Sequence, residues 1–170
     1  MNAQDFRDKW QKPLVRYTLA SSAAQGLSDD VREMLTRTGL PASAEPWLFF
    51  GETDQVSHAA YYPIGQLPNG SVICVETATD RIVIDDGVEG DAPWLLNSSL
   101  EALYESIVLY DAFIREVLRR NPRYSVDYKI PEGMLKKLTD DLTACDPDAF
   151  VGEGFWFNAV RALDDRDGMK

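Results

Sequence analysis

Short apolar runs in the middle of the chain have the length and spacing of β-strands. Residues 71–76 and 81–85 are both rich in β-branched residues, and a polar stretch at residues 77–80 separates them. This arrangement predicts a β-hairpin. Because the connections in this region are short, the strands are expected to pair mostly antiparallel. Other apolar runs, bounded by proline, glycine or polar residues, predict further strands at residues 46–50, 59–64 and 94–96.

A long amphipathic helix is expected after the last of these strands. In residues 99–120, apolar side chains recur every three or four positions, which is the spacing of one helical face. Ser98 is expected to cap the helix, with Glu101 completing a capping box. Additional apolar residues widen the stripe beyond one face. The helix therefore either lies between the sheet and the C-terminal part of the chain, which is favoured, or mediates self-association.

The remaining segments have weaker patterns. Helices are predicted over residues 2–12, from the N-cap Ser28 to a stop at Gly39, and over residues 131–143. Residues 124–130 could be extended. Residues 155–163 are predicted to form a strand, because bulky residues alternate there and both faces are apolar at its start.

These elements predict an α+β fold with one domain over residues 1–170. A central, mostly antiparallel sheet of about five or six strands would pack with helices, including the long one near residues 99–120. Within the domain, residues 39–114 would supply the core sheet and the start of the long helix. Residues 1–26 would form a helical extension at the N-terminal end, and the acidic tail at residues 164–170 is expected to fray.

Acidic residues are concentrated in the same central part of the chain. The sequence has 28 Asp and Glu against 17 Lys and Arg, a formal net charge of −11. Residues 38–114 hold 12 acids and one base, Arg81, so this segment carries the whole net charge while the flanks cancel. Such a field repels nucleic acid and anionic membranes and attracts basic partners. Solubility alone would also explain an acidic chain, but the concentration of charge favours a basic partner.

No pattern for catalysis, metal binding or cofactor binding occurs in the sequence. The sole histidine, His58, has no nucleophile motif to work with, and no phosphate-binding glycine motif is present. One histidine and two distant cysteines do not make a zinc site. The acids of residues 85–91 fall at the wrong intervals for a calcium-binding EF-hand loop. We therefore expect no cofactor, no metal and no enzymatic activity.

Other sequence features bear on location and on the core. Cys74 lies in a strand pattern and is expected to be a buried hydrophobe. No signal peptide and no apolar run near the ~20 residues of a membrane span are recognisable, so a cytoplasmic location is expected. Trp10 lies in a polar helix and either docks onto the body, the simpler option, or meets a partner. The other tryptophans lie in apolar runs and are expected in the core: Trp47, Trp94 and Trp156.

The order of several short motifs resembles the SUKH superfamily, most closely the fourth subgroup of its bacterial immunity proteins. The resemblance covers roughly residues 39–113, with a weaker match near the C-terminal end. The motifs that carry it are Gly39-Leu40-Pro41, Ile64-Gly65, Asn69-Gly70 before a β run, Trp94, Asn97-Ser98-Ser99-Leu100 and the late pair Phe155-Trp156.

This resemblance implies a non-enzymatic immunity protein that binds and blocks a cognate toxin domain, often a basic nuclease, of a polymorphic-toxin or contact-dependent inhibition system. The partner would be a protein rather than nucleic acid or membrane, and a monomer is favoured. From charge alone, and not from a family motif, the acidic partner-binding face is placed on loops at Glu52, Asp54, Asp85, Asp86, Glu89 and Asp91.

Two alternatives remain open at this point. The SUKH superfamily also includes regulatory adaptors, so the partner could be a signalling or cell-wall factor. A small hydrolase that uses carboxylates would instead require a deep pocket with converging acids of perturbed pKa. A binding protein would present a shallow acidic surface.

Overall fold

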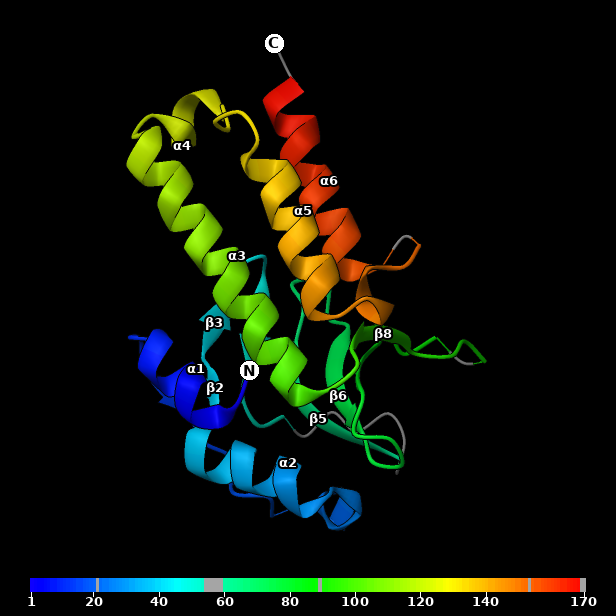
Figure 1. The fold of residues 1–170 in the computed structure, drawn as a ribbon. Coiled ribbons are helices and arrows are strands. Elements are labelled where there is room, and N and C mark those ends of the chain that lie inside the picture. The colour runs from blue at the N-terminus through cyan, green and yellow to red at the C-terminus, as the bar shows by residue number, and fades with distance from the viewer. Residues whose placement is uncertain (21, 54–59, 89, 153, 169–170) are drawn as a thin grey trace.

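A six-stranded antiparallel sheet forms the centre of the protein, and helices lie against it (Figure 1). The computed structural model describes residues 1–20, 22–53, 60–88, 90–152 and 154–168. The architecture is α+β with one long helix, so the predicted fold class is confirmed. Among the described residues, no helix is both long enough and apolar enough to cross a bilayer.

Every strand of the large sheet pairs with its neighbour in sequence, in the order β3-β4-β5-β6-β7-β8. The predicted hairpin is confirmed as β6 and β7, with Cys74 opposite Val83. A separate two-stranded sheet joins β1 to β2. The strands are β1 (Leu14–Val15), β2 (Leu40–Pro41), β3 (Ser43–Ala44), β4 (Leu48–Phe50), β5 (Tyr61–Gln66), β6 (Val72–Glu76), β7 (Ile82–Asp85) and β8 (Trp94–Asn97).

Helix α3 runs across the molecule, with α5 and α6 on one side and α1 on the other (Figure 1). Helix α3 contacts both α5 and strand β8, so it packs between the sheet and the C-terminal helices, as expected from its wide apolar stripe. The α-helices are α1 (Ala3–Lys9), α2 (Asp29–Glu33), α3 (Leu100–Arg120), α4 (Tyr124–Asp127), α5 (Met134–Cys145) and α6 (Phe155–Gly168). Short 3-10 turns occupy Ser22–Gly26 and Asp148–Phe150, and a π-helical turn, Met34–Thr38, extends α2.

The start of α3 differs from the prediction by one residue. The N-cap is Ser99, whose hydroxyl accepts the backbone N–H of Ala102 at 3.1 Å. The backbone N–H of Ser98 instead donates to the carboxylate of Asp146 at 2.7 Å. With Ser99 as the cap, Glu101 occupies the second helical position and not the third, so the predicted capping box is wrong.

The N-terminal helix docks onto α3 through aromatic rings. Phe6 is fully buried and stacks on Tyr104 with ring centroids 4.1 Å apart, while Trp10 stacks on Phe6 at 5.9 Å. Trp10 is itself buried, so the simpler of its two interpretations is confirmed. The segment at residues 1–26 is only partly helical, because it also supplies strand β1.

The prediction for the C-terminal part of the chain was wrong at residues 155–163. These residues form the first part of α6, which continues to Gly168 and so includes much of the segment expected to fray. Residues 124–127 form the short helix α4 and are not extended. The buried side chains of α6 follow helical spacing, at Phe155, Trp156, Ala159, Val160 and Leu163.

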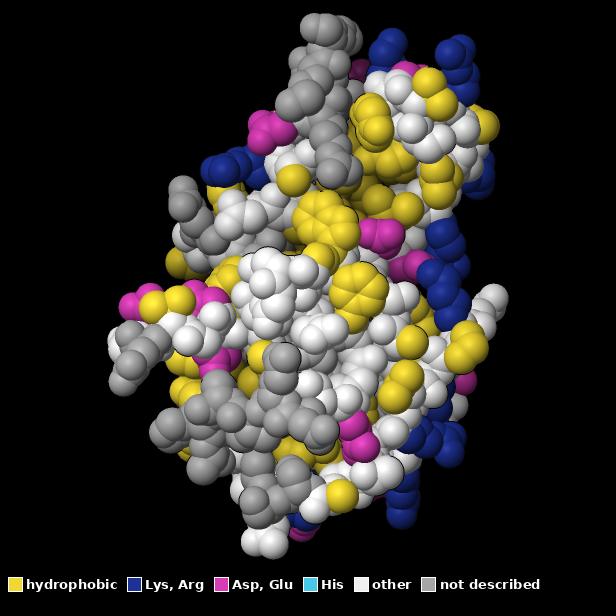
Figure 2. All heavy atoms as spheres, turned by 180° about the vertical axis from the view of Figure 1, so that it is seen from behind, with side chains coloured by type: hydrophobic (Ala, Val, Ile, Leu, Met, Phe, Trp, Pro, Cys, Tyr) yellow, Lys and Arg dark blue, Asp and Glu magenta, His cyan; other side chains and the backbone are white. Residues whose placement is uncertain are grey.

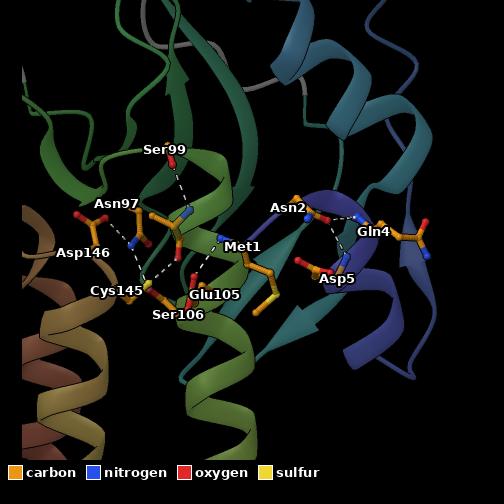
Figure 3. Close-up of polar contacts among 11 residues, drawn as sticks. Met1, Asn2, Gln4, Asp5, Asn97, Ser99, Glu105, Ser106, Cys145 and Asp146 are labelled. Carbon is orange, nitrogen blue, oxygen red and sulfur yellow. Dashed lines mark hydrogen bonds and ion pairs between the residues drawn. The ribbon is translucent and has the colours of Figure 1, made fainter.

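A buried polar network joins β8 to three helices, and Figure 3 shows the part formed by Asn97, Ser106 and Asp146. The amide of Asn97 donates to Asp146 at 2.9 Å and to Ser106 at 3.2 Å. Its oxygen accepts the indole N–H of Trp156 at 3.1 Å. Asn97, Ser106, Asp146 and Trp156 are all buried, and they come from β8, α3, the end of α5 and α6. The network therefore fixes how the C-terminal helices sit on the edge of the sheet.

Candidate partner-binding surface

The two faces of the sheet have different surroundings. Along β6, Ile73 and Val75 join the main core that the helices cover. Val72 and Cys74 point to the other face, since successive side chains of a strand alternate. There they form a small separate apolar cluster with Val83, against which Tyr61 packs. The sheet thus has an apolar floor on the face turned away from the main core.

Carboxylates lie close to this apolar floor. Burial, and then the nearby negative charges of Glu76 and Asp85, raises the pKa of the Tyr61 phenol. Burial and the charge of Asp85 also raise the pKa of the Cys74 thiol to about 12. Asp85 is the cross-strand partner of Val72, so it lies on the same face as the apolar floor. Tyr61 and Glu76, which are paired across β5 and β6, were not recognised from the sequence as members of a candidate surface.

The end of β7 and the loop that follows it carry three of the predicted acidic residues that the structure describes, Asp85, Asp86 and Asp91. Asp85 accepts the backbone N–H of Gly87 at 2.9 Å, and Asp86 accepts that of Val88 at 3.1 Å. The N–H of Asp91 donates to the carbonyl of Val88 at 3.2 Å. Local hydrogen bonds of this kind shape the loop. It projects from the sheet, and acidic and hydrophobic side chains lie together on it at the left of Figure 2.

Exposed hydrophobic side chains lie on or next to this loop and also near the other edge of the sheet. Val88 is 54% exposed and Trp94, at the start of β8, is 38% exposed.

On the β3–β4 turn and on β4, Trp47 is 45% exposed and Phe49 is 44% exposed. The expectation that Trp47 and Trp94 are core residues was therefore wrong, whereas Trp156 is buried as predicted. Both exposed tryptophans lie at an end of a short strand, where the sheet no longer covers them.

Glu52 lies apart from the β7–β8 loop. Its carboxylate accepts the hydroxyl of Thr18 at 2.8 Å and also the Thr18 backbone N–H, and these bonds lower the pKa of Glu52. Burial, and then the charge of Glu52, raises the pKa of Tyr62, a residue of the main core. Tyr62 and Tyr61 point to opposite faces of β5, so Glu52 and Asp85 act on different sides of the sheet. Asp54, Glu89 and His58 lie outside the described residues.

Little of the negative charge in residues 38–114 is neutralised by ion pairs. Glu105 pairs with the N-terminal ammonium at 3.0 Å. Asp111 pairs with Lys12 at 2.9 Å and with Arg115 at 2.8 Å. In the described part of the chain, no other acid of this segment forms an ion pair, so its field extends into solvent.

The acids of one pocket are held by cations and are not poised for catalysis. A pocket of about 380 Å³ lies between α3 and α5, and its two acids are Glu116 and Asp141. Arg119 and Arg120 contact Glu116 at 2.7 and 2.6 Å, and Lys137 pairs with Asp141. The ion pairs with the arginines lower the pKa of Glu116 to about 2, the opposite of what a general acid needs. Among the described residues, no group of three or more His, Cys, Asp or Glu could hold a metal ion.

Comparison with known proteins gives the family. The model of the SUKH-4 immunity protein family matches residues 8–162, which include all eight strands and helices α2 to α5. The chain belongs to the SUKH-4 immunity protein family. The resemblance inferred from short motifs is thereby confirmed, and it supports immunity as the function of this SUKH-4 protein. Neither the curated proteins nor the solved structures gave a match to the chain.

Within this SUKH-4 protein, the motif residues have distinct structural roles. Asn97 is the centre of the buried network, and Ser99 caps α3. Gly39 has φ +81°, and a Cβ at that position would lie 2.1 Å from the carbonyl oxygen of Val15. These residues hold the fold together. Asn97, Ser99 and Gly39 therefore serve the fold, whereas Trp94, another residue of the motif set, is exposed at the surface.

Proposed function

We propose that this SUKH-4 protein neutralises the basic toxin domain of a bacterial polymorphic-toxin or contact-dependent inhibition system by binding it. The β7–β8 loop and the adjoining face of the sheet that carries Val72, Cys74 and Val83 would form the interface. The observation that carries this proposal is the uncompensated negative charge of residues 38–114, part of which lies beside exposed hydrophobic side chains.

The composition of the surface supports a protein partner. Trp94 and Val88 would supply apolar contacts at the centre of the interface, since aromatic residues dominate binding energy in protein complexes. The surrounding acids Asp85, Asp86 and Asp91 would meet the Lys and Arg side chains that a nuclease uses on phosphates. Glu89 belongs to the same loop in sequence. Glu52 would contribute only if the interface also reaches the other side of the sheet.

The decisive experiment reverses the loop charges and measures association with the toxin domain. In the loop variant, Asp85, Asp86, Glu89 and Asp91 all become Lys. The association rate constant at low salt should fall about tenfold or more, and its dependence on salt should flatten, because steering by opposite charge is lost. The measurement is stopped-flow or surface-based kinetics over a range of ionic strength.

A matched control separates local from total charge. Reversing four exposed acids on the helical side of the molecule changes the net charge by the same amount; these are Asp140, Asp148, Asp164 and Asp165. The control should alter the rate constant by less than about threefold. If both variants slow association equally, or neither does, the placement of the interface on the β7–β8 loop is wrong.

The alternative functions predict different observations. A toxin partner predicts that the adjacent gene encodes a large secreted protein with a variable C-terminal domain, and that this domain co-purifies with the chain. A regulatory adaptor predicts neither result. A carboxylate-dependent hydrolase needs converging, unpaired acids in a pocket. In the pocket between α3 and α5, the cation pairing of Glu116 and Asp141 argues against such catalysis.

A further inference from the structure

A second recess, of about 240 Å³, lies where the β3–β4 turn meets helices α3, α4 and α6. A hollow with a hydrophobic floor is visible in the upper part of Figure 2. The recess is smaller than the roughly 300–1,000 Å³ typical of small-molecule sites, so it suits a single side chain. Its lining includes Glu45, Trp47, Tyr110, Ile114, Tyr124 and Leu163.

The chemistry of the lining is that of a site for an organic cation. Three aromatic rings, from Trp47, Tyr110 and Tyr124, lie around the recess together with one carboxylate, Glu45. Among the described residues that line the recess there is no Lys or Arg, and no described residue forms an ion pair with Glu45. The faces of aromatic rings attract cations, most strongly where water is partly excluded. The Glu45 carboxylate adds a charged hydrogen-bond acceptor.

The backbone conformation of Trp47 also supports a binding site at the recess. Trp47 has φ +67°, a left-handed conformation that bulky residues rarely adopt and that costs about 1–2 kcal/mol. The side chain so held is 45% exposed and lies against the recess. A large apolar ring kept in a costly conformation at the surface is typical of a binding site.

We propose that this recess receives an arginine side chain of a basic protein partner. The planar guanidinium would stack on the aromatic rings and donate hydrogen bonds to Glu45, which the point charge of a lysine would do less well. The identity of the partner as the toxin domain rests on the function proposed above, but the chemistry of the recess does not. The recess would add a specific anchor to an interface otherwise steered by diffuse charge.

The first experiment tests the recess without any toxin. N-acetyl-arginine methylamide is titrated into the full chain, and its neutral isostere N-acetyl-citrulline methylamide is the comparison, with binding followed by NMR at the Trp47 indole. The arginine probe should bind roughly tenfold more tightly. Glu45→Gln should reduce this preference to about threefold or less, whereas Glu132→Gln, an exposed control, should leave it unchanged. Equal binding of both probes overturns the proposal.

The second experiment separates this proposal from the proposed function. Trp47→Ala should weaken the arginine probe and the toxin domain together, and Trp47→Phe, which keeps an aromatic ring, should restore part of both. If the probe responds but toxin binding does not, the recess is not part of the toxin interface and that assignment is refuted. If the toxin domain never binds but the probe still does, the proposed function fails and the cation site stands.

Discussion

Substitution of Asn97 should be among the most damaging single changes in the protein. Asn97→Ala removes the amide that donates to the Asp146 carboxylate at 2.9 Å and the oxygen that accepts the Trp156 indole at 3.1 Å. Loss of a hydrogen bond to a charged group costs about 1.5–3 kcal/mol, and a buried donor left without a partner costs about 1–3 kcal/mol. Because Asp146 keeps the Ser98 N–H, we expect a combined loss of about 3–5 kcal/mol.

The assay is equilibrium unfolding in urea, followed by far-UV circular dichroism so that changes of tryptophan do not affect the signal. A double-mutant cycle with Trp156→Phe, which removes the indole N–H, should give a coupling energy of about 1 kcal/mol or more. Asn69→Ala is the control, because that amide is exposed and accepts a single N–H at 3.2 Å. The reasoning is refuted if Asn97→Ala costs no more than this control, or if the two core substitutions are additive.

Two further predictions concern the cysteines and a glycine. At pH 8, Cys145 should react with iodoacetamide at least about tenfold faster than Cys74. Burial raises the pKa of both thiols, but Cys74 is buried and its pKa is raised to about 12, whereas Cys145 is only partly buried. Equal labelling rates by mass spectrometry would contradict this. Gly39→Ala should destabilise the protein by about 3 kcal/mol or more, because the new Cβ would meet the Val15 carbonyl. As a control, Gly70→Ala should cost only about 1 kcal/mol, because the surroundings of Gly70 are open. Similar unfolding midpoints for the two variants would refute the steric argument.

The elements predicted correctly from the sequence are those specified by local signals. Strands β6 and β7 follow from two β-branched runs around a polar turn, and α3 follows from its periodic stripe. The N-cap Ser28 and the stop at Gly39 are confirmed because capping chemistry depends on residues a few positions apart. Short-range rules were sufficient at each of these positions.

The errors arose where packing against distant residues decides the structure. Residues 155–163 alternate in bulk like a strand, yet the buried set Phe155, Trp156, Ala159, Val160 and Leu163 also has helical spacing. Both periods fit such a short apolar run, and only contact with α5 and β8 selects the helix. The helical spacing was present in the sequence and could have been weighed against the alternation.

The candidate surface was harder to predict than the fold. Charge counting identified the acidic segment, but it could not separate Glu52, which faces Thr18 and Tyr62, from Asp85 beside Tyr61. That distinction depends on which face of β5 each side chain approaches. The exposure of Trp47 and Trp94 depends on where the neighbouring strands end, which hydrophobicity alone does not reveal.

The strand order described above also has a consequence for how the chain folds during synthesis. All six strands of the large sheet lie before residue 98 and pair only with sequence neighbours, so the sheet requires only short loop closures. The partners of Asn97 at residues 146 and 156 emerge from the ribosome later. A nascent chain can therefore assemble the strands and the acidic loop early, and acquire its final rigidity only when α6 arrives and completes the buried network.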